Sequence, residues 1–356
     1  MTKQPQAHRA LFCCTRLPTS IVRRQAQRGL TMIELLVAMV ISLLIVLAAV
    51  AALTVTQRGF STVDSSSQLR DNIRFTTDLI QRLGVQSGFK DIKEAAKRAP
   101  PLVAGVDPDP DPNVTGFNNA VLTAGDPAGT RTPRTTTDGS DILVLRYQNL
   151  ETFPNSGISD GSMIDCSGNR NAAIPANRYD RMISVLHVAE SQGEPSLMCS
   201  STTTGGAFPT TQPIVRGVEN FQVLYGVQGV VAGTAPPAAA ASAAKDVANE
   251  SAPDRYLRAD QLTVAGNDAA TKANWRNVRS VRIGLVLRGP PNSSQDSASQ
   301  TFHPFGAAKS SSGGAIGSAM SNTAALDPGT IFTPTVDGRL RQTASFTVHL
   351  RNDQGL

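Results

Sequence analysis

The chain has 356 residues, of which 17% are charged and 40% hydrophobic, with 29 glycines and 22 prolines. This composition is typical of a β-rich exported domain with long surface loops. The net charge of +5 comes from residues 1–29, since removing their six basic side chains leaves 33 − 6 = 27 basic against 28 acidic residues. The near-neutral remainder argues against a nucleic-acid-binding surface, and only a short strip at Arg276, Arg279 and Arg282 stays a candidate.

An apolar segment follows Gly29 directly. From Leu35 to Leu53 the only polar residue is Ser42. About 20 such residues in a helix cross a hydrocarbon layer of roughly 30 Å. The positive charges before the segment favour the cytoplasmic side, which places the rest of the chain outside. A cut at Gly29 would remove the charges and keep the span, so the segment is predicted to be an anchor and not a discarded signal.

Glu34 lies near the start of this span. A carboxylate there costs several kcal/mol unless it is paired or reaches the interface. One interpretation is a side chain that extends to the membrane edge. The other is a charge pair with the free amine that cleavage would create at Leu30, in the same chain or in a neighbouring subunit. Such a pair would set the axial register between packed helices.

The segment Gly29–Val37 (GLTMIELLV) resembles the signal of type IV prepilins and type II secretion pseudopilins. The resemblance implies that a membrane-embedded prepilin peptidase cuts after Gly29 and methylates the amine of Leu30. Glu34 matches the Glu that the family has as its fifth mature residue. Leu30 departs from the usual Phe, and the 29-residue leader exceeds the common length, which leaves the true start codon open.

Helical periodicity continues beyond the span. Its apolar and small positions recur every three or four residues: Phe60, Val63, Leu69, Ile73, Thr76, Ile80 and Leu83. The pattern predicts one long helix, with a membrane half over 30–55 and an amphipathic half over 56–88. It should end near Gly84 or Gly88. The alternative is a separate soluble helix after a linker at Gly59.

Residues 89–140 are predicted to be a loop region, with a short helix possible over 91–99. Pro, Asp, Thr and Gly dominate from residue 100 onward. Asp107, Asp109 and Asp111 alternate as calcium ligands can, but Pro112 stands where such a loop needs Gly. A stiff, solvated loop is the preferred interpretation.

A β-rich domain is expected over 141–356. Short runs of β-branched and aromatic residues predict its strands: Asp141–Tyr147, Arg181–Val188, Ser196–Ser200, Val218–Val227, Val278–Arg288 and Thr343–Arg351. Their alternation predicts an antiparallel sheet with one face packed on the amphipathic half of the helix. The fold class is therefore α+β. Low-complexity stretches predict mobile insertions within 230–275 and over 307–325.

Cysteine usage also changes at the leader. Cys13 and Cys14 lie before the cut, so only Cys166 and Cys199 remain in the exported part. A disulfide between them would close a loop of roughly 34 residues and stabilise the domain by about 3–4 kcal/mol. Two unpaired thiols or a metal pair are the alternatives, but no CxxC or histidine cluster supports a metal.

No catalytic motif is present in the sequence. It has no GxSxG, P-loop, GxGxxG or HExxH pattern. His187, His303 and His349 are isolated in the sequence, and single strand histidines are more often structural than catalytic. We therefore expect no enzyme activity, cofactor or metal.

Several later segments resemble the PilW group of minor pilins: 71–75 (DNIRF), 141–147 (DILVLRY), 217–227 (GVENFQVLYGV), 275–283 (WRNVRSVRI) and 350–352 (LRN). The resemblance implies a tip or priming subunit of a type IV pilus. Its partners would be other minor pilins, the major pilin, prepilin peptidase and an inner-membrane assembly platform.

The expected location is the bacterial inner membrane, with one span and a periplasmic C-terminal domain, and then the pilus at the cell surface. A minor pseudopilin of type II secretion is the first alternative. A membrane-tethered binding protein or enzyme is the alternative from another class.

Overall fold

The computed structural model describes residues 29–90, 111–122, 131–133, 139–170, 172, 174–175, 177, 179–202, 211–236, 252–294, 298–306 and 330–352. The chain divides into two compact units, Met1–Gln57 and Arg58–Leu356. Residues 1–28 of the leader, residues 91–99, Asp107, Asp109 and the 307–325 stretch lie outside the described residues.

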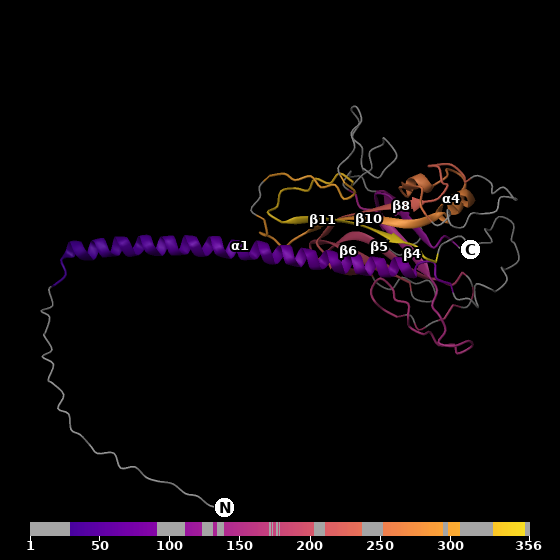
Figure 1. Cartoon of the computed structure of the whole chain (residues 1–356), viewed down its shortest axis with the longest axis horizontal. Helices are drawn as coiled ribbons and strands as arrows, with labels where there is room; N and C mark the ends of the chain where they lie inside the picture. The colour runs from indigo at the N-terminus through magenta and orange to yellow at the C-terminus, as the bar shows by residue number, and fades with distance from the viewer. Residues whose placement is uncertain are drawn as a thin grey trace, which may run out of the picture. The chain divides into compact units, whose positions relative to one another are not determined.

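Helix α1 runs from Met32 to Gln86 without interruption (Figure 1). The predicted continuity is therefore confirmed, and the alternative of a linker at Gly59 is wrong. The helix ends one turn after Leu83, and Gly88 takes the left-handed conformation (φ 79°) that stops many helices.

The larger unit contains a five-stranded antiparallel sheet in the order β1-β4-β5-β6-β7. Its strands are β1 (Val114–Phe117), β4 (Ile142–Tyr147), β5 (Met182–Ser191), β6 (Glu194–Ser201) and β7 (Gln212–Arg216).

A four-stranded antiparallel sheet has the order β11-β10-β8-β9. Its strands are β8 (Val218–Val227), β9 (Arg255–Leu257), β10 (Val278–Arg288) and β11 (Arg341–His349). Figure 1 shows β8, β10 and β11 side by side. All six predicted strands are present, so the α+β fold class is confirmed.

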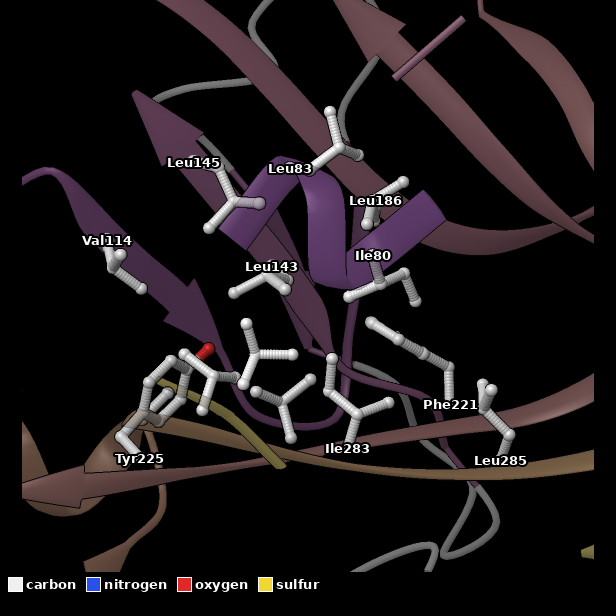
Figure 2. Close-up of a cluster of buried hydrophobic side chains, with 14 of the residues drawn as sticks. Ile80, Leu83, Val114, Leu143, Leu145, Leu186, Phe221, Tyr225, Ile283 and Leu285 are labelled. Carbon is white, nitrogen blue, oxygen red and sulfur yellow. The ribbon is translucent and has the colours of Figure 1, made fainter. Parts of the chain in front are cut away.

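The core forms where the second half of α1 meets both sheets. Ile80 and Leu83 of α1 share one buried cluster with Leu143, Leu186 and Ile283 (Figure 2). The helix contributes residues spaced three or four positions apart, which lie on one of its faces. The strands contribute every second residue, because alternate side chains of a strand point to the same face. Burying each such aliphatic side chain stabilises the fold by about 1.5–3 kcal/mol.

Two predicted irregular regions contain regular structure. In the expected loop 89–140 the structure has β1 and a hairpin of β2 (Ala120–Leu122) and β3 (Arg131–Pro133). The short β1 run is stabilised by pairing with β4, which composition alone does not reveal. In the expected mobile insertion 230–275 lie β9, the 3-10 turn Asp260–Leu262 and helix α4 (Asp268–Trp275), which the Asn267 side chain caps.

The strands also differ from the one-sided burial that was predicted. Every residue of β4 is buried, and so are nearly all those of β8. A second apolar cluster of Ala120, Ile142, Val144 and Val185 explains this for the first sheet. β2, which was missed in the sequence, covers part of that second face with Ala120 and Leu122.

Candidate functional site

The start of α1 is capped by its own residues. The Glu34 carboxylate accepts hydrogen bonds from the backbone N–H of Thr31 (3.0 Å) and from its hydroxyl (3.1 Å). The Glu34 N–H in turn donates to the Thr31 hydroxyl (3.4 Å). This reciprocal Thr-x-x-Glu pattern satisfies donors that a helix start leaves unpaired. The sequence analysis missed Thr31, although this spacing was available as a signal.

Gly29 and Leu30 precede the helix as a non-helical, exposed segment. The structure thus places Gly29, Leu30 and Glu34 within one short stretch at the start of α1. An accessible, non-helical peptide bond beside a capped helix is a geometry that a protease can reach.

The apolar first half of α1 has no covering residues in the part of the chain that is described. Every residue from Gly29 to Ser61 is exposed. The most apolar 18-residue window has a mean hydropathy of 3.0, so α1 is by length and composition able to cross a membrane. A surface this apolar is not stable in water and requires lipid or other helices.

The amphipathic half of α1 packs on the domain only from Ser65 onward, which is later than its sequence pattern indicates. Phe60 is 71% exposed and Val63 is 70% exposed, whereas Ser65, Leu69 and Ile80 are buried. Of the recurring positions that predicted the helix, Phe60 and Val63 therefore do not pack on the domain. Their exposure extends the uncovered apolar surface of α1 beyond Val55.

Cys166 and Cys199 form a disulfide with a Cα–Cα distance of 5.6 Å, as predicted. Both residues are almost completely buried. The bond attaches the β4–β5 connection to β6. The same connection is fixed to the helix by the Gln86 side chain, which donates to the Ile164 carbonyl (3.0 Å) and accepts from the Ile164 N–H (3.1 Å).

Three arginines and three carboxylates form a cluster that joins the two sheets. Arg341 binds Glu219 (2.6 Å) and Asp337 (2.7 Å). Glu194 at the start of β6 accepts from Arg288 (2.7 Å) and Arg339 (2.9 Å). We call these residues, with their mutual contacts, the arginine–carboxylate cluster. Such forked pairs fix geometry as well as charge.

The cluster shifts the ionisation of two carboxyls. Hydrogen bonds from Arg339, followed by those from Arg288, lower the pKa of Glu194 despite some burial. Burial alone would raise the pKa of Asp337, but its bonds to Arg341 outweigh that effect and lower this pKa.

A cavity of about 770 Å³ lies between the β1 region and α4. Lys272 of α4 reaches across it to Asp111 (3.1 Å) and also pairs with Asp268 (3.3 Å) of its own helix. Burial would raise the pKa of the Asp111 carboxyl, but Lys272 and nearby arginines lower it. Among the described residues, the lining of this cavity contains no histidine or cysteine.

The remaining candidates from the sequence do not come together. Among the described residues no three His, Cys, Asp or Glu side chains are placed to hold a metal ion. His187 lies on β5 and His349 on β11, in different sheets. Arg279 is buried and donates to the Arg276 carbonyl (2.9 Å), so the proposed basic strip is not a continuous surface.

Comparison with known proteins identifies two matching families. Residues 185–352 match the model described as type IV pilus-assembly protein W, and residues 24–50 match the prokaryotic N-terminal methylation motif. No curated protein matches the chain significantly. Among solved structures, a type IV-like pilin from Thermus thermophilus, TTHA1219, is similar at 14% identity and a TM-score of 0.36, over 80% of this chain and 97% of that one.

The two family matches cover complementary parts of the chain. The methylation motif includes Gly29, Leu30 and Glu34, and the other match extends from β5 past β11. Together with the exposed apolar helix and the antiparallel sheets, they confirm the resemblance found in the sequence. These matches support a type IV pilin-like, PilW-like family for this chain.

Proposed function

We propose that this protein is a minor pilin, incorporated at the tip or in the initiation complex of a type IV pilus, where it primes assembly. The observation that carries the proposal is the apolar half of α1, which the described fold leaves uncovered. In the bilayer lipid covers it, and in a filament the helices of other pilins do. The match to a pilus-assembly protein over 185–352 favours a pilus over type II secretion.

The proposed sequence of events starts at the Gly29–Leu30 bond. Prepilin peptidase cuts there and methylates the Leu30 amine, and the helix stays in the inner membrane with its C-terminal domain in the periplasm. An assembly platform then transfers the helix into a bundle with other minor pilins and the major pilin. Because apolar helix surfaces exchange lipid for protein contacts at little net gain, packing and the few polar groups select the neighbours.

Glu34 has two roles in this proposal. Within its own helix it caps Thr31, and between subunits its charge pairs with a Leu30 amine. The two roles can be separated by substitution. Glu34→Gln keeps a side-chain acceptor for the cap but removes the charge, while Thr31→Val removes the capping hydroxyl and keeps the charge.

We expect both Glu34→Gln and Glu34→Ala to be cleaved normally and to be incorporated at least tenfold less into sheared filaments. Thr31→Val should be cleaved and incorporated much better than either. The readout is the ratio of filament to membrane protein in cells that produce each variant. Wild-type incorporation of Glu34→Gln would exclude the charge pair and leave only the cap.

Intact mass tests the proposal as a whole. Protein from membrane and sheared-filament fractions should begin at N-methylated Leu30. A gain of about two daltons on reduction would report the disulfide. A chain cut at Leu30 but found only with a secretion apparatus would favour a pseudopilin. An uncut chain absent from filaments would mean a tethered protein of another class.

A further inference from the structure

The two large sheets have four outer strands, and three of them are protected against pairing with another chain. β1 and β9 are only four and three residues long. β7 contains Pro213, and its pairing with β6 has a register shift. β11 has nine residues without proline, and it pairs with β10 without any shift. Short strands, prolines and bulges are three devices that hinder edge-to-edge association, and β11 has none of these three.

Two hydrogen bonds, one at each end of β11, fix which of its backbone groups are free. The Gly289 N–H donates to the Leu340 carbonyl (2.7 Å), and the Leu350 N–H donates to the Arg279 carbonyl (3.0 Å). Both pairs continue the β10–β11 register, in which bonded and non-bonded pairs alternate. The even-numbered residues of β11 therefore bond to β10. The odd-numbered ones direct their N–H and C=O groups away from it: Arg341, Thr343, Ser345, Thr347 and His349.

These outward groups have no hydrogen-bond partner among the described residues. The side chains of Ala344 and Phe346 lie on the core-facing side of the sheet, beside Leu285 and Ile283 of β10. They pack on the core but are only partly buried. An added strand would satisfy the backbone groups and also cover these two side chains.

The edge is complementary to itself. If a second copy pairs antiparallel with Ser345 opposite Ser345, each outward residue faces an outward residue, as the bonding requires. Ala344 then lies opposite Phe346 of the second copy, a small side chain beside a large one, and Thr343 lies opposite Thr347. Arg341 meets His349 only at the two ends. The arrangement is two-fold symmetric, as closed pairs of identical subunits are.

We propose that β11 is a self-association edge through which two copies of this chain join their four-stranded sheets into one, with Ser345 on the two-fold axis. This surface lies outside the apolar half of α1. The inference therefore does not depend on the proposed role in a pilus.

Cysteine cross-linking tests the register directly. Ser345→Cys is introduced into the full chain with Cys13→Ser and Cys14→Ser, so that no leader thiol competes. In a bonded antiparallel pair the Cα atoms lie about 5.5 Å apart, within the range that a disulfide spans. We expect mild oxidation, in detergent and in membranes, to convert most of the protein to a covalent dimer on non-reducing gels.

Thr343→Cys in the same background is the matched control. In the proposed register the two copies of residue 343 lie about 13 Å apart along the strands, too far for a disulfide. This single variant should stay monomeric, and adding Thr347→Cys should restore the dimer. Equal cross-linking of Ser345→Cys and Thr343→Cys would mean random collision and overturn the proposal.

Ser345→Pro supplies a second measurement. It removes an outward N–H without removing a bond to β10, so the domain should fold while the mass in light scattering falls to that of a monomer. Absence of any Ser345→Cys dimer, or cross-linking chiefly to a different membrane protein, would show that a second copy is not the occupant.

Discussion

Gly84 shows how a single residue sets the distance between α1 and the last strand. It lies on the buried side of α1, and a Cβ atom built there collides with the Val348 side chain of β11. The close approach buries Leu83 and Val348 in the same cluster. A glycine in a helix costs up to about 1 kcal/mol relative to alanine, so its presence here reflects packing.

Gly84→Ala should therefore destabilise the protein despite the better helix propensity of alanine. Overpacking costs about 1–3 kcal/mol, against a gain of about 1 kcal/mol. Urea unfolding followed by fluorescence of Trp275, the only tryptophan, measures the difference. Gly59→Ala is the control because nothing lies within 4 Å of the added atom, and it should not lower stability. Unchanged or higher stability of Gly84→Ala would contradict this account.

Acid sensitivity should arise from the arginine–carboxylate cluster. The pKa values of Glu194 and Asp337 are lowered in the folded state, so their contribution is present above the unfolded pKa of about 4 and is lost as the pH falls below it. We expect the free energy of unfolding to decrease as the pH falls from about 5 to about 3, the range in which these carboxyls become protonated.

Arg339→Leu should make this decrease shallower, because Glu194 loses its principal hydrogen-bond donor. Arg216→Leu is a matched control, since Arg216 of β7 donates to the neutral Gln192 in the β5–β6 turn. Equal acid slopes for the wild type and Arg339→Leu would assign the pH dependence to other groups.

At the scale of elements, the disulfide holds the β4–β5 connection on β6 across a sequence separation of 33 residues. Replacing both cysteines by alanine should cost about 3–4 kcal/mol by the chain-entropy model, without burying a new hydroxyl. Urea unfolding of the double variant, compared with the oxidised wild type without reductant, measures this. A loss below about 1 kcal/mol would mean that the Gln86–Ile164 bonds alone fix the connection.

The elements that could be predicted are those with strong local signals. β10 and β11 were found because their alternation is long, and α1 because its apolar run is followed by a helical stripe. β1 and β2 were not predicted, because strands of four and three residues are too short to show an alternating pattern. Their stability comes from strands they pair with elsewhere in the chain. The arginine–carboxylate cluster could not be predicted either, since it joins residues up to 145 positions apart.

At the scale of the whole molecule, the apolar surface of α1 has to be covered by something else. Phe60 belongs to that surface but contributes nothing to the described core. Phe60→Ser should therefore leave the urea midpoint unchanged and reduce incorporation into filaments severalfold. Arg70→Ser, at another exposed position of α1, should change neither. A loss of stability in Phe60→Ser would show that the residue packs on its own domain.

The contact between α1 and residues near position 350 also determines how late in synthesis the domain can be completed. Val348 packs on Gly84, and the Asn352 side chain donates to the Val85 carbonyl (2.7 Å) across 267 positions. At a synthesis rate of about 5–20 residues per second, α1 leaves the ribosome roughly 15–50 seconds before its partner exists. The domain consequently stays unfinished throughout translation, which is the condition in which a chain can still be threaded across a membrane.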